Sequence, residues 1–85
     1  MEKKLRRVLR KLGFGRKGDQ ISLNSSETGR VAGYIISPRF RRQTQEQRQD
    51  ALWKGLEAEL TKDELRLIVT ILTMTPEEVD DSIAA

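Results

Sequence analysis

The chain contains neither cysteine nor histidine among its 85 residues. Without cysteine it cannot form disulfides, use a thiol nucleophile, or hold zinc or an iron–sulfur cluster through thiolates. Without histidine it lacks the commonest metal ligand and the commonest general base near neutral pH. We therefore expect a protein that is not an enzyme and that holds no cofactor and no metal by itself.

The sequence also lacks a long apolar run and an internal repeat. No stretch approaches the ~20 residues that a membrane-spanning helix needs. The basic N-terminus is not followed by the apolar core of a secretory signal. We expect a cytoplasmic protein without membrane association, and the length predicts one domain over residues 1–85.

Charge is divided unevenly along the chain. Residues 1–48 carry 13 lysines and arginines against four acids, a net charge of +9, whereas residues 49–85 carry three basic residues against nine acids, a net charge of −6. A basic half of this kind indicates a surface that meets an anion, and nucleic acid is the first candidate. The alternative is a bipolar, solvated surface whose two halves partly neutralise each other.

Residues 2–12 are predicted to form an amphipathic helix. Their apolar residues recur at i, i+3, i+4 and i+7, which forms one stripe, and the opposite face is basic. The stripe is short and has no aromatic anchor, so packing on a sheet is favoured over binding to a membrane surface. Its members are Leu5, Val8, Leu9 and Leu12.

Residues 13–18 carry the letters of the G-x-G-x-x-G motif, in the sequence Gly-Phe-Gly-Arg-Lys-Gly. A dinucleotide-binding fingerprint follows a strand and opens a helix, whereas these glycines follow a helix and precede a strand. We therefore expect a flexible basic loop that carries Arg16 and Lys17.

Two strands, a long helix and a third strand are predicted next. Alternating apolar residues indicate an antiparallel hairpin of strands 20–25 and 30–37. Thr44 and Gln47 form the capping-box pattern of a helix over 45–60. The nearly continuous apolar run from Leu65 to Met74 indicates a strand buried on both faces, either inside the sheet or covered by a partner. Thr75 and Pro76 then begin a short helix that reaches about Ser82.

The predicted order is therefore α-β-β-α-β-α in an α+β fold. The connection through the long helix indicates a parallel crossover, which gives a three-stranded mixed sheet with helices on one face. Residues 1–18 supply the basic helix and loop, and residues 19–83 supply the sheet and the remaining helices. A polar connection is expected over 61–64.

Two short motifs in this part of the chain resemble those of BolA-like proteins. The first is similar to that family's F-x-G-x-S-x-x-x-R-Q signature, with Arg42 in place of the glycine and threonine in place of the serine. The second resembles the T-x-T-P-E-E ending of the third strand. The similarity covers roughly residues 19–80, and its motif residues are Phe40, Thr44, Arg48, Gln49, Thr75, Pro76, Glu77 and Glu78.

The resemblance implies a fold similar to class II KH domains and two roles. One is nucleic-acid binding in the regulation of transcription and the stress response. The other is partnership with monothiol glutaredoxins in iron–sulfur cluster handling. The histidine on which the second role depends falls at Leu67 here, and the loop from Ser25 to Gly29 offers no histidine or cysteine. Glu27 in that loop is a poor ligand for a soft cluster.

The candidate nucleic-acid-binding residues are arginines at the start of the long helix, together with the loop cations. Backbone donors at that helix N-terminus would also face an anion. Aromatic residues are few, so contacts to phosphate should dominate and binding should be salt-sensitive and little dependent on base sequence. The set is Arg39, Arg41, Arg42, Arg48, Arg16 and Lys17.

Two other functions are open to this sequence. A protein-interaction adaptor would use the apolar third strand and its edge, with a glutaredoxin-like protein as one partner.

Catalysis would need carboxylates that converge on a substrate. Glu77 and Glu78 are better explained as first-turn residues of a helix, and Asp80 and Asp81 as a solvated face. The oligomeric state is left open by the sequence.

Overall fold

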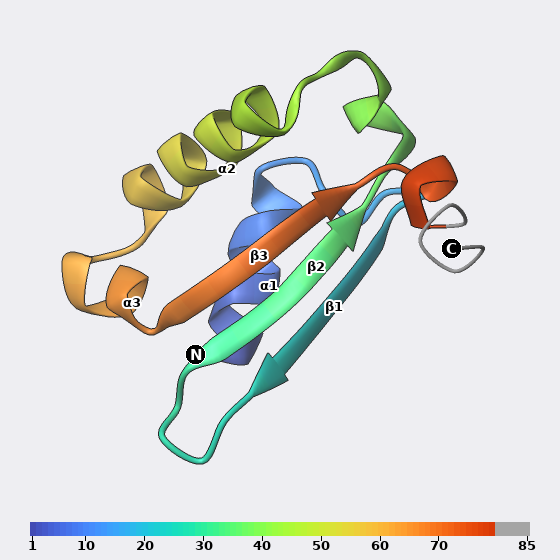
Figure 1. The fold of residues 1–85 in the computed structure, drawn as a ribbon. Helices are drawn as coiled ribbons and strands as arrows, with labels where there is room; N and C mark the ends of the chain where they lie inside the picture. Colours follow the sequence, from blue (N-terminus) through green and yellow to red (C-terminus); the bar gives the residue numbers. More distant parts are fainter. Residues whose placement is uncertain (80–85) are drawn as a thin grey trace.

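The computed structural model describes residues 1–79 of the chain, in which a helix, a pair of strands, a run of helices and a third strand follow one another. A helical turn at 76–79 ends the described chain, and the predicted extension to about Ser82 lies outside it. The fold is α+β with a three-stranded mixed sheet, as predicted (Figure 1). Its elements are α1 (Glu2–Lys11), β1 (Gln20–Ser25), β2 (Val31–Ile36), the 3₁₀ helix η1 (Pro38–Arg42), α2 (Gln45–Glu59), α3 (Lys62–Arg66) and β3 (Ile68–Met74).

The sheet has the strand order β1-β2-β3. The hairpin of β1 and β2 is antiparallel, and β3 pairs with β2 in parallel after the crossover through α2 and α3. Both connections agree with the sequence prediction. Gly33 in β2 permits the close approach of the first two strands, because a Cβ atom there would overlap the carbonyl oxygen of Ser22.

β3 is an edge strand, and the prediction that it lies inside the sheet is wrong for the described chain. The nearly continuous apolar run is explained by a bulge in β3. The extra residue of the bulge interrupts the regular alternation of core-facing and solvent-facing side chains along the strand. Ile68 lies opposite Val31 and Thr70 opposite Ala32, so Val69 has no opposite residue. Val69 is 59% exposed, while Ile68 and Ile71 on either side of it are buried.

The core lies between one face of the sheet and the helices α1 and α2 (Figure 1). The apolar stripe predicted for the first helix points into it, since Leu5, Val8 and Leu9 are buried. This use of the stripe agrees with packing on the sheet. The other core residues are Leu23, Val31, Ile35, Phe40, Leu52, Leu56, Leu60, Ile68 and Ile71.

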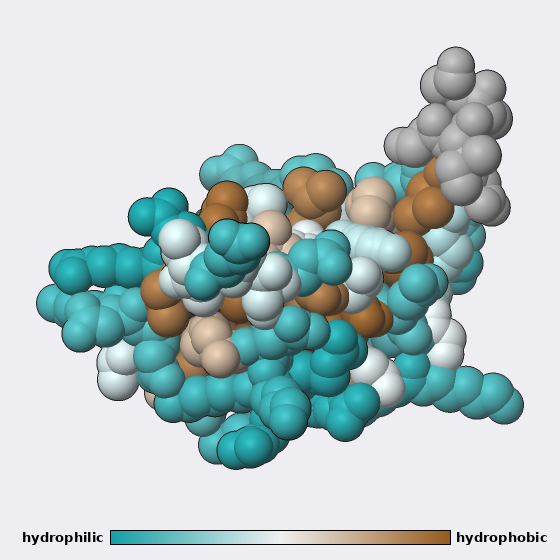
Figure 2. All heavy atoms as spheres, turned by 90° about the horizontal axis from the view of Figure 1, so that it is seen from below, coloured by the Kyte–Doolittle hydropathy of each residue, from teal (hydrophilic) through white to brown (hydrophobic). Residues whose placement is uncertain are grey.

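The opposite face of the sheet is partly apolar, and none of the helices in residues 1–79 packs across its middle (Figure 1). Leu72 is opposite Tyr34, and Met74 is opposite Ile36. Leu72 is 55% exposed. Seen from below, hydrophilic side chains surround apolar ones that are scattered across the middle and upper parts of the view (Figure 2).

The helix α3 takes residues 62–64 from the expected polar connection and Leu65 and Arg66 from the predicted third strand, which begins only at Ile68. The Thr61 hydroxyl accepts from the Glu64 backbone N–H, and the Glu64 carboxylate accepts from the Thr61 backbone N–H, so the two residues form a capping box. The same Thr-x-x-Glu spacing that marks 75–78 is present at 61–64, and it was the available signal for this helix. Its five residues are too few to show an apolar period, which is why the pattern of apolar residues did not reveal it.

Candidate functional site

The segment from Ser37 to Thr44 turns the chain from β2 into α2. Pro38 begins η1, and the Ser37 hydroxyl accepts a hydrogen bond from the Arg39 backbone N–H at 3.2 Å. Phe40 is buried in the core. Thr44 caps α2 in a complete capping box with Gln47, as the sequence predicted.

The three-residue period of η1 sends its side chains in different directions. Residues i and i+3 lie above one another on a 3₁₀ helix, so Arg39 and Arg42 share one side. Phe40 points into the core, and Arg41 forms an ion pair with Glu77. Only part of the predicted arginine cluster is therefore directed to a common surface.

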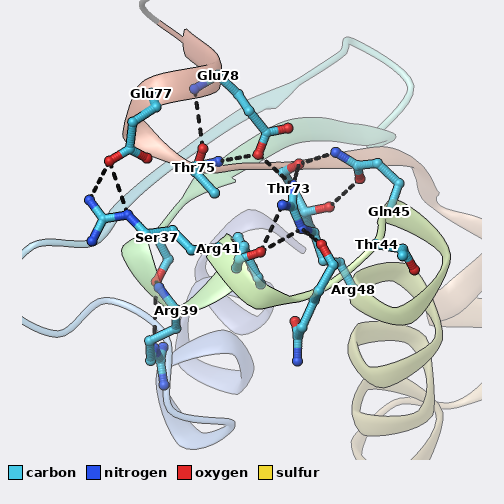
Figure 3. Close-up of polar contacts among 12 residues, drawn as sticks. Ser37, Arg39, Arg41, Thr44, Gln45, Arg48, Thr73, Thr75, Glu77 and Glu78 are labelled. Carbon is cyan, nitrogen blue, oxygen red and sulfur yellow. Dashed lines mark hydrogen bonds and ion pairs between the residues drawn. The ribbon is translucent and has the colours of Figure 1, made fainter.

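Arg48 lies inside the protein rather than on that surface. Its side chain is 6% exposed, and its guanidinium donates to the carbonyl oxygens of Phe40 and Thr73 (Figure 3). Nη1 also donates to Glu78 at 2.7 Å. A guanidinium enclosed by these partners holds η1, α2 and the residues after β3 together, so we leave Arg48 out of the surface that meets an external anion.

Two glutamines of α2 extend this network to β3. Gln45 donates to the Thr73 carbonyl oxygen at 2.8 Å, and the Thr73 hydroxyl donates back to Gln45 at 2.9 Å. Gln49 donates to the Ile71 carbonyl oxygen at 2.9 Å and accepts from the Trp53 indole at 3.0 Å. These bonds satisfy buried polar groups where α2 crosses the edge of the sheet.

The residues after β3 close the network. The Thr75 hydroxyl accepts from the Glu78 backbone N–H at 3.1 Å, and Glu78 accepts from the Thr75 backbone N–H at 3.0 Å. Pro76 stands at the first helical position, where no backbone donor is needed. We call Gln45, Arg48, Gln49, Thr73, Thr75 and Glu78 the polar clamp (Figure 3).

The acids of this region have lowered pKa values. The hydrogen bond from the Thr75 backbone and the one from Arg48 hold the pKa of Glu78 below its ordinary value. The hydrogen bond from Arg41 does the same to the pKa of Glu77. Both carboxylates are therefore charged partners of arginine, and they do not share the raised pKa of a general acid.

Arg39 joins η1 to the glycine-containing loop. Its guanidinium lies 5.1 Å from the centre of the Phe14 ring and donates to the Gly13 carbonyl oxygen and to Asp19, the latter at 2.9 Å. Burial by itself would raise the pKa of Asp19, but the hydrogen bond from Ser37 and the charge of Arg39 outweigh it and lower that pKa. The loop that was expected to be flexible is thus attached to η1 at several points.

Cations from three segments gather around this loop. A Cβ atom on Gly13 would lie 3.4 Å from Arg39 Nη1 and 3.8 Å from Arg16 Nη2. A Cβ atom on Gly15 would lie 3.4 Å from Arg10 Cγ. We call Arg10, Arg16, Lys17, Arg39 and Arg42 the basic corner.

The basic corner keeps most of its charge available. Arg10, Arg16, Lys17 and Arg42 are exposed and form no ion pair within residues 1–79, and the side chain of Arg39 is 42% exposed beside Asp19. Arg10 was not among the predicted binding residues. Its place in the last turn of α1, next to the loop, was the signal that could have included it.

Elsewhere the two charged halves neutralise each other. Within residues 1–79, the pairs Lys4–Glu64, Lys11–Glu59, Arg41–Glu77 and Arg48–Glu78 each join a cation of residues 1–48 to an acid of the second half. The bipolar alternative therefore describes part of the surface, whereas most cations of the basic corner have no acidic partner within residues 1–79.

A pocket of about 220 Å³ opens beside the basic corner. Two aromatic rings form part of its wall, with the centroids of Phe14 and Phe40 5.7 Å apart. Its lining residues are Phe14, Arg39, Phe40, Gln43, Arg48 and Ala51. Sequence reasoning missed this pocket because Phe14 and Ala51 meet only in the folded chain.

Leu67, where the BolA-like resemblance would place a histidine, lies beside the loop between β1 and β2. The Val31 backbone N–H donates to the Leu67 carbonyl oxygen at 2.8 Å, which brings Leu67 to the start of β2. Leucine has no atom that binds a metal. Within residues 1–79, no three acidic, cysteine or histidine side chains lie close enough together to hold a metal ion.

No helix within residues 1–79 has the length and apolar character needed to cross a membrane. Comparisons with family models, with curated proteins and with solved structures find no match to this chain.

Proposed function

We propose that this protein is a non-enzymatic, BolA-like regulatory module that binds nucleic acid through the basic corner. The observation that carries the proposal is that Arg39 of η1 and Arg16 of the loop lie near Gly13, while Arg10 of α1 lies near Gly15 in the same loop. Most of them have no acidic partner in residues 1–79, whereas Lys4, Lys11 and Arg41 on other sides of the protein are each paired with a glutamate.

Phosphate is the ligand that this arrangement favours. Guanidinium groups donate two parallel hydrogen bonds to phosphate, and displacement of condensed counterions supplies affinity without reading the bases. The two arginines on one side of η1, Arg39 and Arg42, are spaced by a single 3₁₀ turn. Binding to phosphates in this way should be weak, strongly salt-dependent and tolerant of base sequence.

The BolA-like assignment is supported by the way the motif residues depend on one another. Arg48 donates to the Phe40 carbonyl oxygen and to the Glu78 carboxylate. Gln49 donates to the Ile71 carbonyl oxygen in β3, and the Thr75 hydroxyl accepts from the Glu78 backbone N–H. A substitution at one of them would therefore leave a buried partner unsatisfied. In this interpretation the family motifs maintain the fold, and Arg42, which replaces the family glycine, adds charge to the binding surface.

The test is a binding titration with a fluorescent single-stranded oligonucleotide at several salt concentrations. We compare the natural protein with the triple variant Arg16→Ala, Lys17→Ala, Arg42→Ala. If each cation contacts one phosphate, the slope of log affinity against log salt should fall by about 2 in the variant.

A matched control removes the same charge from a different surface. Lys54, Lys62 and Arg66 lie on the acidic half, and their triple replacement by alanine should leave the slope nearly unchanged. Equal losses in both triple variants, or affinity that does not change with salt, would contradict binding at the basic corner.

A second candidate function is supported by the open face of the sheet. The exposed Leu72 beside Tyr34, together with Val69 at the free edge of β3, offers an apolar surface for a protein partner. In the BolA-like interpretation that partner is a monothiol glutaredoxin. Leu72→Thr should weaken its capture by the immobilised protein, and the Arg16, Lys17, Arg42 variant should not. The reverse pattern would reject this candidate.

A further inference from the structure

We propose that the pocket beside the basic corner accepts one unstacked base of a single-stranded nucleic acid, while neighbouring cations hold the phosphates on either side. This inference rests on the proposed function and adds a base-binding subsite to it. The pocket, its aromatic wall and its position among the arginines carry the argument.

The volume of the pocket limits what can enter. Sites for drug-sized ligands usually measure about 300–1,000 Å³, and this one measures about 220 Å³. It therefore fits a planar ring system of the size of one base. An intact duplex keeps its bases stacked and paired, so only a single strand or an extruded base could present one to it.

The wall chemistry matches a base rather than a bare phosphate. The ring of Phe14 and the methyl group of Ala51 form an apolar wall on which a base can pack, and the buried ring of Phe40 lies behind it. A phosphate would lose its hydration there without gaining hydrogen bonds from these groups.

Side chains in the lining supply the polar contacts. Arg48 lines the pocket, and within residues 1–79 its Nη2 makes one hydrogen bond, to the Phe40 carbonyl oxygen, although the nitrogen carries two hydrogens. Gln43 lines the same pocket and adds an amide that can both donate and accept. These groups suit the carbonyl and ring-nitrogen acceptors on the edge of a base.

The position of Arg39 links the pocket to the phosphates. It lines the pocket, lies over the Phe14 ring and shares a side of η1 with Arg42. A strand whose base enters the pocket would thus have its backbone at the basic corner. Both contacts come from the same end of the molecule, so a short oligonucleotide is enough to make them.

The experiment compares two probes of equal charge. One is an oligothymidylate of about 12 nucleotides, within the range of site sizes for single-strand binding proteins, and the other is an abasic strand with the same phosphates. The natural protein should bind the base-containing strand about 5- to 150-fold more tightly, the range that stacking of one base supplies.

A variant that fills the pocket tests whether the preference for the base-containing strand arises there. Ala51→Leu places a larger side chain in the pocket on an exposed position of α2, and Ala58→Leu makes the same change on an exposed position that does not line the pocket. Ala51→Leu should remove most of the preference for the base-containing strand and keep the salt dependence. Ala58→Leu should retain both.

Equal affinity of the natural protein for the two strands would overturn the base pocket and leave phosphate binding at the basic corner in place. Preference for bases that survives Ala51→Leu would also overturn it. Failure of both strands to bind at low salt would reject the proposed function itself, and the base pocket with it.

Discussion

Arg48 holds the carbonyl oxygen of Phe40 with two nitrogens, Nε at 3.1 Å and Nη2 at 2.7 Å. The guanidinium also lies 5.5 Å from the centre of the Phe40 ring. The side chain that the sequence marks as a candidate nucleic-acid contact is thus a cross-link between η1 and α2. Its ion pair with Glu78 carries the same cross-link to the residues after β3.

Replacing Arg48 by methionine should destabilise the protein by about 3 kcal/mol. The substitution keeps much of the buried volume but leaves the carbonyl oxygens of Phe40 and Thr73 without these donors. Urea unfolding followed by circular dichroism measures the change. Arg42→Met is the control, because that side chain is exposed and unpaired within residues 1–79, and its effect should stay within about 0.5 kcal/mol. Equal effects of the two variants would show that the polar clamp contributes little to stability.

The two arginines at the end of η1 should differ in nucleic-acid binding. Arg42 has no ion-pair partner in residues 1–79, whereas Arg41 is paired with Glu77. Arg42→Ala should lower the slope of log affinity against log salt by about 0.7, the value for one phosphate contact on a single strand. Arg41→Ala should lower it less. If Arg41→Ala lowered the slope more than Arg42→Ala, the nucleic acid would contact the surface near the end of β3 instead of the basic corner.

Acid should weaken the polar clamp through Glu78. The folded pKa of this residue lies below its ordinary value of 4.5, so the charged form is favoured in the folded state. The stabilisation is fully present above the unfolded pKa and is lost as the pH falls through the lower folded pKa. Because the side chain is 42% exposed, its ion pair should contribute less than about 1 kcal/mol.

Thermal unfolding of Glu78→Gln between pH 7 and pH 3 measures this contribution. The variant should be less stable than the natural protein at neutral pH, and the difference should shrink as the pH falls. Glu57→Gln, at an exposed glutamate without an ion pair in residues 1–79, should show no such convergence. A difference that is constant with pH would exclude the charge of Glu78 as its source.

The capping box at 61–64 should stabilise α3. Thr61→Ala removes the hydroxyl that accepts from the Glu64 backbone N–H at 3.2 Å, and loss of such a cap costs about 1 kcal/mol. Lys62→Ala is the control in the next residue, with an exposed side chain and no ion pair in residues 1–79. Chemical unfolding of the two variants compares them directly. A loss no larger than that of the control would indicate that α3 depends on its packing alone.

Gly33 and Gly55 should respond differently to alanine. At Gly33 a Cβ atom would overlap a backbone oxygen of the neighbouring strand, and that strand cannot move without breaking the ladder. At Gly55 it would lie 2.8 Å from the side chain of Leu12, which can change its rotamer, and alanine favours the helix by about 1 kcal/mol. Gly33→Ala should therefore cost several kcal/mol and Gly55→Ala much less. Similar unfolding free energies for the two variants would contradict the close approach of β1 and β2.

Local features of the fold were readable from the sequence. The stripe beginning at Leu5 and the capping box of Thr44 and Gln47 depend on residues a few positions apart, and both are present in the structure. The capping pattern at Thr61 was equally local, although it was interpreted as a connection. The bulge at Val69 was not readable, because it depends on pairing with β2 across more than thirty residues.

By itself the sequence determined which ligand chemistry is missing, where α1 and α2 begin and how charge is divided between the halves. Only the tertiary structure decided which cations remain available. Ion pairs such as Arg41–Glu77 join residues far apart in the chain, and burial of Arg48 follows from the packing of α2 on β3. A cation in a sequence has no fixed neighbour, so its partner and its exposure are set when the elements pack, and that packing leaves the basic corner exposed.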